Sequence, residues 1–290
     1  MKKCLRKLFQ EYLNGSGLGN RMKIIDYFEE STSCKFQKEF VTIMNLKKFT
    51  RHLLDNKSPG TSRTYAAIMK AFLNNFRGEN WMPESFEKIL SLPKDEPETT
   101  YLSEEDIKKF VAYIPESDME YYVQRLFFIC LMTGCRKSDG KIITSSRVRN
   151  NKFTYVAKKT GKKSSEMYID DSVIEILNDE RYKKLQTNGC SDRTYNNTLR
   201  EICKKVGITE EITLYQAGKY VTKPKYGFFA SHSARRSAAT NMYNRDAASL
   251  LNISKMLGHT SVAQTQRYIR CSTEDTEAMK AFKSSFRLNS

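Results

Sequence analysis

Apolar residues recur at helical spacing along most of this chain, and the stretches differ in how much of each helix is apolar. In the first 92 residues, four short stripes each leave a polar face, and Ser58-Pro59-Gly60 interrupts the chain before the fourth. The stripes are Leu5, Leu8, Phe9 and Tyr12; Met22, Ile25 and Phe28; Phe40, Ile43, Met44 and Leu53; and Tyr65, Ile68, Phe72, Leu73 and Phe76. We expect them to form a small bundle of helices with basic exposed faces.

A polar segment separates this bundle from the rest of the chain. Residues 93–101 read PKDEPETTY, and their prolines and acidic residues disfavour a stable packed element. The run Ser103-Glu104-Glu105-Asp106 has the pattern of a capping box, so a helix is expected to begin there. The predicted organisation is therefore a helical domain over 1–92, a linker over 93–101 and a second domain over 102–290.

The second domain combines a buried helix with a short hairpin. Residues 119–133 are apolar almost all round, which predicts a buried helix that Gly134 ends. Residues 141–165 contain many basic residues and no acidic one, and Phe153, Tyr155 and Ala157 alternate as in a strand before a turn at Thr160-Gly161. Two helices over 172–206, an irregular segment over 208–230 and a polar tail helix over 271–290 complete a mainly α fold with a small antiparallel β-sheet.

Residues 231–268 concentrate the candidate chemistry. Ser231 is a candidate N-cap, and His232 and Arg235 would share one face of the helix that follows it. A second helical stripe formed by Ile253, Met256 and Leu257 stops at Gly258. His259 and Tyr268 come after it. Arginine presents a planar fork of donors that matches phosphate oxygens, histidine can donate to them or move a proton near neutral pH, and tyrosine can form a covalent intermediate.

Each of these residues also has an ordinary structural explanation. A histidine after a helix is usually a capping or half-buried group, two adjacent arginines usually lie on a solvated face, and a tyrosine near a helix end usually packs in the core or at its rim. The combination of two histidines, an arginine and a tyrosine in one stretch, rather than any single member, favours a site that binds and attacks a phosphate.

The charge of the chain agrees with a polyanionic partner. Lysine and arginine total 49 against 33 acidic residues, a formal net charge of +16. Phosphate contacts with release of counterions would exploit this excess, so we expect nucleic acid, although a basic protein without such a partner has the same composition.

Other features of the composition narrow the class of protein. The seven cysteines are scattered without a Cys-x-x-Cys pair, which fits a reducing compartment and predicts neither a disulfide framework nor a zinc site. No acidic cluster resembles a magnesium site, and no stretch approaches the ~20 apolar residues of a membrane helix. The basic start lacks the apolar run of a signal peptide, so a soluble intracellular protein is expected.

Four short motifs together resemble a known family. HSARR, LGH and TQRYI, at residues 231–270, resemble the C-terminal signature of the tyrosine recombinases, the lambda-integrase-like or phage integrase family. TGCRKSD, which contains Arg136 and Asp139, resembles the first-arginine motif of that family, with Cys135 in place of the usual leucine. The resemblance covers about residues 101–270, with a looser similarity over the N-terminal bundle.

The resemblance implies a catalytic domain and a role for each motif residue. Tyr268 would attack the scissile DNA phosphate, forming a 3′-phosphotyrosyl bond and releasing a 5′-hydroxyl. Arg136 and Arg235 would stabilise the negative charge that develops on the phosphate. His232 would accept the proton of the tyrosine, and His259 would donate to a phosphate oxygen. Because the energy of the broken bond is kept in the covalent intermediate, the resemblance implies no cofactor, neither metal nor ATP.

The basic hairpin carries the remaining predicted catalytic group. The family places a catalytic lysine in such a β-turn, which points to Lys159 as the general acid for the leaving 5′-oxygen. Lys158 would face the opposite side of the strand. The residues expected to contact DNA are Lys158, Lys162, Lys163, Arg63 and Arg236.

Partners and biological role follow only from the resemblance. Double-stranded DNA is the expected partner, with a homotetramer on two recombination sites; a monomer without DNA and an accessory DNA-bending protein are left open. The tail helix would fold back or dock on a neighbouring subunit. A cytoplasmic protein of a bacterium or phage, associated with the nucleoid, is expected, and its role stays open between an integrase, an invertase and a dimer resolvase.

Alternatives remain at two points. A straight helix would place His259 and Tyr268 about 13 Å apart, so they share one phosphate only if the segment bends.

A telomere resolvase or a type IB topoisomerase has related chemistry, but the short chain disfavours both. A DNA-binding regulator without cleavage and an RNA-binding protein belong to other classes; the filled motif positions disfavour the first, and the lack of an aromatic stacking platform disfavours the second.

Overall fold

The computed structural model describes residues 4–13, 18–94, 96–154, 167–245, 248–259, 261–267 and 269. These residues form mostly α-helices with two small antiparallel sheets, so the predicted fold class is confirmed. The chain divides into two compact units: Met1–Glu98 with Leu214–Val221, and Thr99–Thr213 with Thr222–Ser290. The boundaries 1–92, 93–101 and 102–290 remain predictions, and the sequence did not anticipate that a later segment groups with the first unit.

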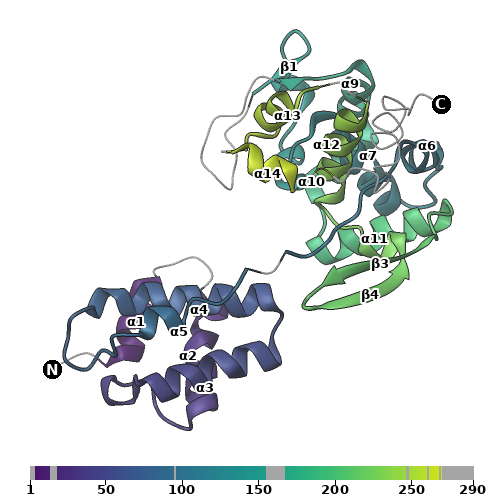
Figure 1. Ribbon diagram of the computed structural model, residues 1–290. Helices are drawn as coiled ribbons and strands as arrows, with labels where there is room; N and C mark the ends of the chain where they lie inside the picture. Colours follow the sequence, from purple (N-terminus) through teal and green to yellow (C-terminus); the bar gives the residue numbers. More distant parts are fainter. Residues whose placement is uncertain are drawn as a thin grey trace, which may run out of the picture. The chain divides into compact units, whose positions relative to one another are not determined.

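The first unit is a bundle of helices (Figure 1). Its core is rich in aromatic side chains. Phe9, Phe28, Phe36, Phe49 and Phe72 are at most 2% exposed, and the rings of Phe9 and Phe72 meet edge to face at 5.0 Å. Such edge-to-face pairs stabilise a core beyond the burial of their area. The elements are α1 (Leu5–Leu13), α2 (Leu18–Thr32), η1 (Lys38–Phe40), α3 (Ile43–Asn56), α4 (Pro59–Leu73), η2 (Asn74–Phe76) and α5 (Phe86–Ile89).

One of the four predicted stripes was assigned wrongly. Phe40 lies in the short turn η1, and the side chains of Ile43 and Met44 are 44% and 63% exposed. Because the Thr42 side chain caps α3, the helix begins at Ile43 and turns these first residues outward. The buried face of α3 is instead formed by Leu46, Phe49 and Leu53.

The second unit is built around α7 (Asp118–Thr133), which packs against α9, α10, α11 and α12 (Figure 1). Most residues of α7 are buried, and Gly134 ends it in the left-handed conformation, as predicted. The capping box that opens α6 is also present, since the side chains of Ser103 and Asp106 each accept from the other's backbone N–H. The other helices are α6 (Glu104–Ala112), α8 (Lys137–Gly140), η3 (Ser145–Arg147), α9 (Asp171–Asn178), α10 (Glu180–Asn188), α11 (Asp192–Lys205), η4 (Lys225–Phe228), α12 (Ser233–Asn244), α13 (Leu250–Leu257) and α14 (Val262–Gln266).

The described residues include the base of the predicted basic hairpin. Strands β1 (Lys152–Phe153) and β2 (Met167–Tyr168) pair antiparallel, with Phe153 opposite Met167, and both of these side chains are buried. Residues 155–166, where the turn of the hairpin is predicted, lie outside the described residues. They include Lys158, Lys159, Lys162 and Lys163.

Two further sequence-based assignments were wrong. Residues 172–206 contain three helices, because the Asp179 side chain accepts from the backbone N–H of Arg181 and Tyr182 and starts α10 anew. Residues 208–230, expected to be irregular, contain the hairpin of β3 (Glu211–Gln216) and β4 (Lys219–Pro224). Ala217 and Gly218 have φ angles of 52° and 85°, which suits a two-residue turn whose twist matches paired strands.

Candidate active site

The helix that carries Arg235 begins one residue later than the sequence suggests. Ser231 is not its N-cap, because α12 starts at Ser233 and the backbone N–H of Ser231 donates to the Asn196 side chain at 2.9 Å. The hydroxyl of Ser233 instead accepts from the Ala230 N–H at 3.0 Å. His232 is the residue immediately before the helix, and its exposed imidazole lies about one turn from Arg235.

The guanidinium of Arg235 joins the ends of two other helices. Its side chain is 1% exposed, and Nη1 donates to the Gly134 carbonyl at 2.8 Å while Nη2 donates to the Leu257 carbonyl. These carbonyls stand at the C-terminal ends of α7 and α13, where the helix dipoles concentrate negative charge. The cation is therefore stabilised by backbone groups two residues before Arg136 and two residues before His259.

Arg136 emerges where α7 ends. It caps α8, and its carbonyl accepts from the N–H groups of Asp139 and Gly140 at 2.9 and 2.8 Å. The side chain is 20% exposed, and Nη1 lies 3.9 Å from a carboxylate oxygen of the buried Asp139. Arg136 is thus fixed at its backbone while its guanidinium reaches the edge of solvent.

Gly134 allows α7 and α13 to approach closely. Its φ of 64° favours glycine, and a Cβ there would come within 2.8 Å of the Met256 Cε and 3.2 Å of a Leu257 methyl group. Cys135, the departure from the family motif, is 1% exposed, and its Sγ lies 3.9 Å from the Sγ of Cys130. The small apolar thiol fits this packed junction.

A tight turn places His259 after α13. Gly258 has a φ of 62°, and the His259 N–H donates to the Ser254 carbonyl at 3.0 Å, the pattern of a Schellman motif. The half-buried imidazole has its Nδ1 2.8 Å from the hydroxyl of Thr265. Burial and, secondarily, the positive charges of Arg235 and Arg136 lower the pKa of His259 to about 4. The imidazole is therefore neutral at pH 7, and the positive charges of both arginines disfavour its protonation.

Tyr268 and Lys159 lie outside the described residues. Among the described residues that precede Tyr268, His259 lies outside the helix Val262–Gln266. Those residues therefore do not form the straight helix for which the 13 Å separation was calculated, and the alternative of a bent segment applies. Beyond α14, the backbone N–H of Ile269 donates to the Thr265 carbonyl at 3.1 Å.

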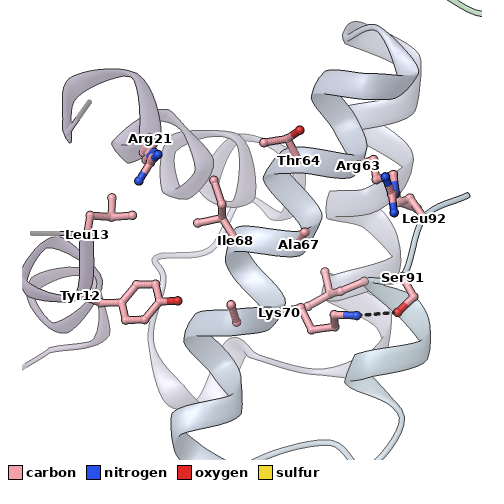
Figure 2. Close-up of a pocket in the computed structure, with 12 residues that line it drawn as sticks. Tyr12, Leu13, Arg21, Arg63, Thr64, Ala67, Ile68, Lys70, Ser91 and Leu92 are labelled. Atoms are coloured by element: carbon pink, nitrogen blue, oxygen red, sulfur yellow. Dashed lines mark hydrogen bonds between the residues drawn. The ribbon is translucent and has the colours of Figure 1, made fainter. Parts of the chain in front are cut away.

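Arg236, expected to contact DNA, is half-buried, and its Nη1 donates to the Thr100 carbonyl at 3.2 Å. Arg63 is exposed on α4 and lines a cavity of about 630 Å³ in the first unit, together with Tyr12, Arg21 and Lys70 (Figure 2). The structure thus gives Arg236 a structural partner, whereas the Arg63 guanidinium faces solvent.

Two further residues of the first unit have structural roles. Ser58 caps α4, and Ser62 is fully buried with its hydroxyl donating to the Leu53 carbonyl at 2.8 Å. The ring of His52 packs against Tyr27 with centroids 5.9 Å apart.

Sequence reasoning overlooked Lys137 and Thr265. The Lys137 side chain is buried, forms an ion pair with Asp192, and places Nζ 4.6 Å from the centre of the Tyr195 ring. Thr265 is fully buried. Both residues lie inside the quoted motifs, Lys137 in TGCRKSD and Thr265 in TQRYI, but their contacts could not be read from the sequence because folding forms them.

Within the described part of the chain, no group of three or more histidine, cysteine or acidic side chains is arranged to hold a metal ion. Over the same residues, no helix combines the length and apolar character required to cross a membrane.

The buried Arg235, the partly exposed Arg136 and the half-buried His259 thus lie where the C-terminal ends of α7 and α13 meet. The model of the phage integrase family matches residues 100–275. The chain therefore belongs to the phage integrase family, the family of tyrosine recombinases that its motifs resemble.

Curated relatives include enzymes of bacteria and phages. Tyrosine recombinase XerC of Caldanaerobacter subterraneus subsp. tengcongensis is 24% identical over 224 residues, which cover 76% of this chain and 61% of that protein. The integrase of Escherichia phage P2 is 24% identical over 183 residues, covering 63% of this chain and 46% of that protein. The chain thus spans about half to three fifths of the length of these relatives.

Solved structures share the fold. The Tn1549 transposon integrase in complex with transposon right end DNA has a TM-score of 0.67 at 12% identity, covering 98% of this chain and 100% of that chain. A lambda integrase dimer bound to a COC′ core site has a TM-score of 0.66 at 14% identity, covering 92% of this chain and 94% of that one. At these identities the similarity concerns the fold.

Proposed function

We propose that the chain is a site-specific DNA recombinase that cleaves and rejoins DNA through a 3′-phosphotyrosyl bond at Tyr268, in integration, excision or inversion. Membership of the phage integrase family supports this proposal. The observation that carries it is the bonding of the buried Arg235 guanidinium to the Gly134 and Leu257 carbonyls. These bonds join the segments that bear Arg136 and His259, which supports the proposal that Arg136, Arg235 and His259 act on one phosphate.

In this proposal the arginines and His259 stabilise the charge of the transition state. Attack on the phosphate adds negative charge to its non-bridging oxygens, and donors already held in place are not reorganised during the reaction. Loss of one such donor typically slows a reaction by about 10²–10³-fold. A neutral His259 serves as a hydrogen-bond donor here, since its pKa of about 4 leaves it uncharged at working pH.

Two proton transfers complete the proposed reaction. Tyrosine has an ordinary pKa of about 10, so the hydroxyl of Tyr268 must lose its proton as it attacks. The exposed imidazole of His232 is the proposed acceptor, and Lys159 is the proposed acid for the leaving 5′-oxygen. The phosphotyrosyl bond keeps the energy of the broken phosphodiester, so rejoining requires no ATP.

The proposed partner is double-stranded DNA, and the full reaction would engage four protomers on two sites, because each duplex has two scissile phosphates. The related structures were solved with DNA bound, which supports this assignment. Contacts from Lys158, Lys162, Lys163, Arg63 and Arg236 would supply affinity. A cytoplasmic location with access to the nucleoid would follow from this activity.

A suicide-substrate assay tests the proposal. Nicked duplexes from the DNA that flanks the gene would be incubated with the protein in EDTA, and a protein–DNA band that resists denaturation would be sought. We expect a band that is lost in Tyr268→Phe and kept in Tyr168→Phe, a control whose side chain is 66% exposed on β2.

Other outcomes would change the assignment. Tight binding without any covalent band would favour a DNA-binding regulator over a recombinase. A band that persists in Tyr268→Phe would show that another residue is the nucleophile, and a band that needs added divalent metal would contradict the metal-independent reaction.

A further inference from the structure

We propose that Thr265 is a positioning residue that directs the ring proton of His259 toward the phosphate and ties this histidine to the backbone on both sides of Tyr268. The inference rests on the proposed cleavage reaction and adds a residue to its machinery.

The first observation is the side-chain contact. The Thr265 side chain is fully buried, and its Oγ1 lies 2.8 Å from Nδ1 of His259. A neutral imidazole has one donor and one acceptor nitrogen, and the partner of one nitrogen decides which carries the proton. When the Thr265 hydroxyl donates to Nδ1, the proton resides on Nε2, where it can be donated to a phosphate oxygen. The opposite arrangement would point a lone pair at the negative oxygen.

The second observation concerns the backbone. The carbonyl of Thr265 accepts from the N–H of Ile269 at 3.1 Å and is also the acceptor of the Arg267 N–H. These two residues flank Tyr268 in the sequence. A single residue therefore contacts His259 through its side chain and anchors the neighbours of the nucleophile through its carbonyl.

Burial makes the contact directional. Thr265 follows the first turn of α14, which begins at Val262, and it is enclosed, so water cannot readily replace its hydroxyl. Valine would fill nearly the same volume without the hydroxyl, while serine would keep the hydroxyl and lose one methyl group. These two substitutions separate hydrogen bonding from packing.

The first test does not depend on activity. Nitrogen-15 NMR of the DNA-free protein would report which ring nitrogen of His259 carries the proton at pH 7. We expect the Nε2–H form in the wild type and in Thr265→Ser, and a mixture of forms in Thr265→Val. A wild-type ring protonated on Nδ1, or an unchanged tautomer in Thr265→Val, would overturn the inference, whether or not the protein cleaves DNA.

The second test measures covalent complex formation on the nicked duplexes. Thr265→Val should form the complex about 10–100-fold more slowly, the usual loss when a residue that orients another is removed. Thr265→Ser should stay close to the wild type. Thr32→Val is the matched control, because the buried hydroxyl of Thr32 donates to the Phe28 carbonyl at 2.7 Å in the first unit.

The outcomes separate the two proposals. If the wild type forms no complex, the proposed function fails, while the NMR result still decides the role of Thr265. If the wild type and Thr265→Val form the complex at equal rates, only the positioning role fails. If Thr265→Ser is as slow as Thr265→Val, the methyl group matters rather than the hydroxyl, which also contradicts the inference.

Discussion

The two units bury different kinds of polar side chain. Among the described residues, those buried in the first unit are neutral: Thr32, Asn45, Thr50 and Ser62. Those buried in the second unit include the charged groups Asp106, Glu120, Lys137, Asp139 and Arg235. Removing a charge from water costs free energy unless hydrogen bonds and opposite charge replace the solvent. The second unit bears part of that cost at Asp139 and Arg235, next to the proposed phosphate site, and part at Asp106 and Glu120, which pair with Lys225 and Lys205. The first unit keeps its charges in water.

The cations of the first unit illustrate the other arrangement. Arg21, Arg63 and Lys70 line one cavity, with Lys70 donating to the Ser91 hydroxyl at 2.9 Å (Figure 2). Groups of this kind can bind phosphates and add affinity, but their solvation limits what each contributes. We therefore expect the same substitution to have a larger effect at a buried cation of the second unit than at an exposed cation of the first unit.

The largest difference is expected between Arg235→Lys and Arg63→Lys. Lysine keeps the charge but lacks the planar fork that joins the Gly134 and Leu257 carbonyls, so cleavage should fall by about 10²–10³-fold. At the solvated position 63, the same change should leave the rate within about 3-fold, because exposed pairs contribute little. Rates of covalent complex formation on one duplex would measure both effects.

A folding control accompanies this prediction. Two carbonyl partners are lost in Arg235→Lys, so its free energy of unfolding should fall by about 1–3 kcal/mol, which urea titration would detect. Equal loss of cleavage in both variants would contradict the contrast between the buried and the solvated arginine.

An effect of intermediate size on stability is expected when alanine replaces either of two glycines whose backbone is left-handed. Gly134 has a φ of 64° and lies against Met256, whereas Gly78 has a φ of 85° and, among the described residues, no neighbour within 4 Å of the position that a Cβ would take. Backbone strain should cost each variant about 1–2 kcal/mol, and the clash with α13 should raise the total for Gly134→Ala to about 3 kcal/mol.

Chemical unfolding would measure the free energy of unfolding that each of the two variants, Gly134→Ala and Gly78→Ala, loses. Cleavage should also drop in Gly134→Ala, because the displaced carbonyl is a partner of Arg235. If both variants lose the same stability, the close approach of α7 and α13 does not contribute as described.

The smallest effect is expected from Arg63→Ala. Loss of one phosphate contact should weaken DNA binding by a similar factor on all sequences and reduce the slope of log affinity against log salt by about 1. Binding isotherms at several salt concentrations would show this. Lys152→Ala, at the base of the basic hairpin in the second unit, provides a comparison, and an unchanged slope for Arg63→Ala would remove Arg63 from the DNA contacts.

Local signals in the sequence predicted much of the helical framework. The capping box at Ser103, the apolar helix ended by Gly134 and the stripe ended by Gly258 were all confirmed. Each depends on neighbouring residues whose caps and spacing act within a turn or two. The predictions failed where two patterns competed, as when the β3–β4 hairpin was read as irregular and Asp179 divided one expected helix.

The sequence by itself determined the chemistry of the site: which side chains carry charge, which can donate to a phosphate, and which motif marks the family. Only the tertiary structure decided that Arg235 bonds to the carbonyls of Gly134, 101 residues away, and Leu257, 22 residues away. It also decided that burial lowers the pKa of His259 and that the ring of this histidine contacts the Thr265 hydroxyl. Caps and periodicity act between near neighbours in the chain, whereas the burial and electrostatic field of a side chain depend on all the segments that pack around it.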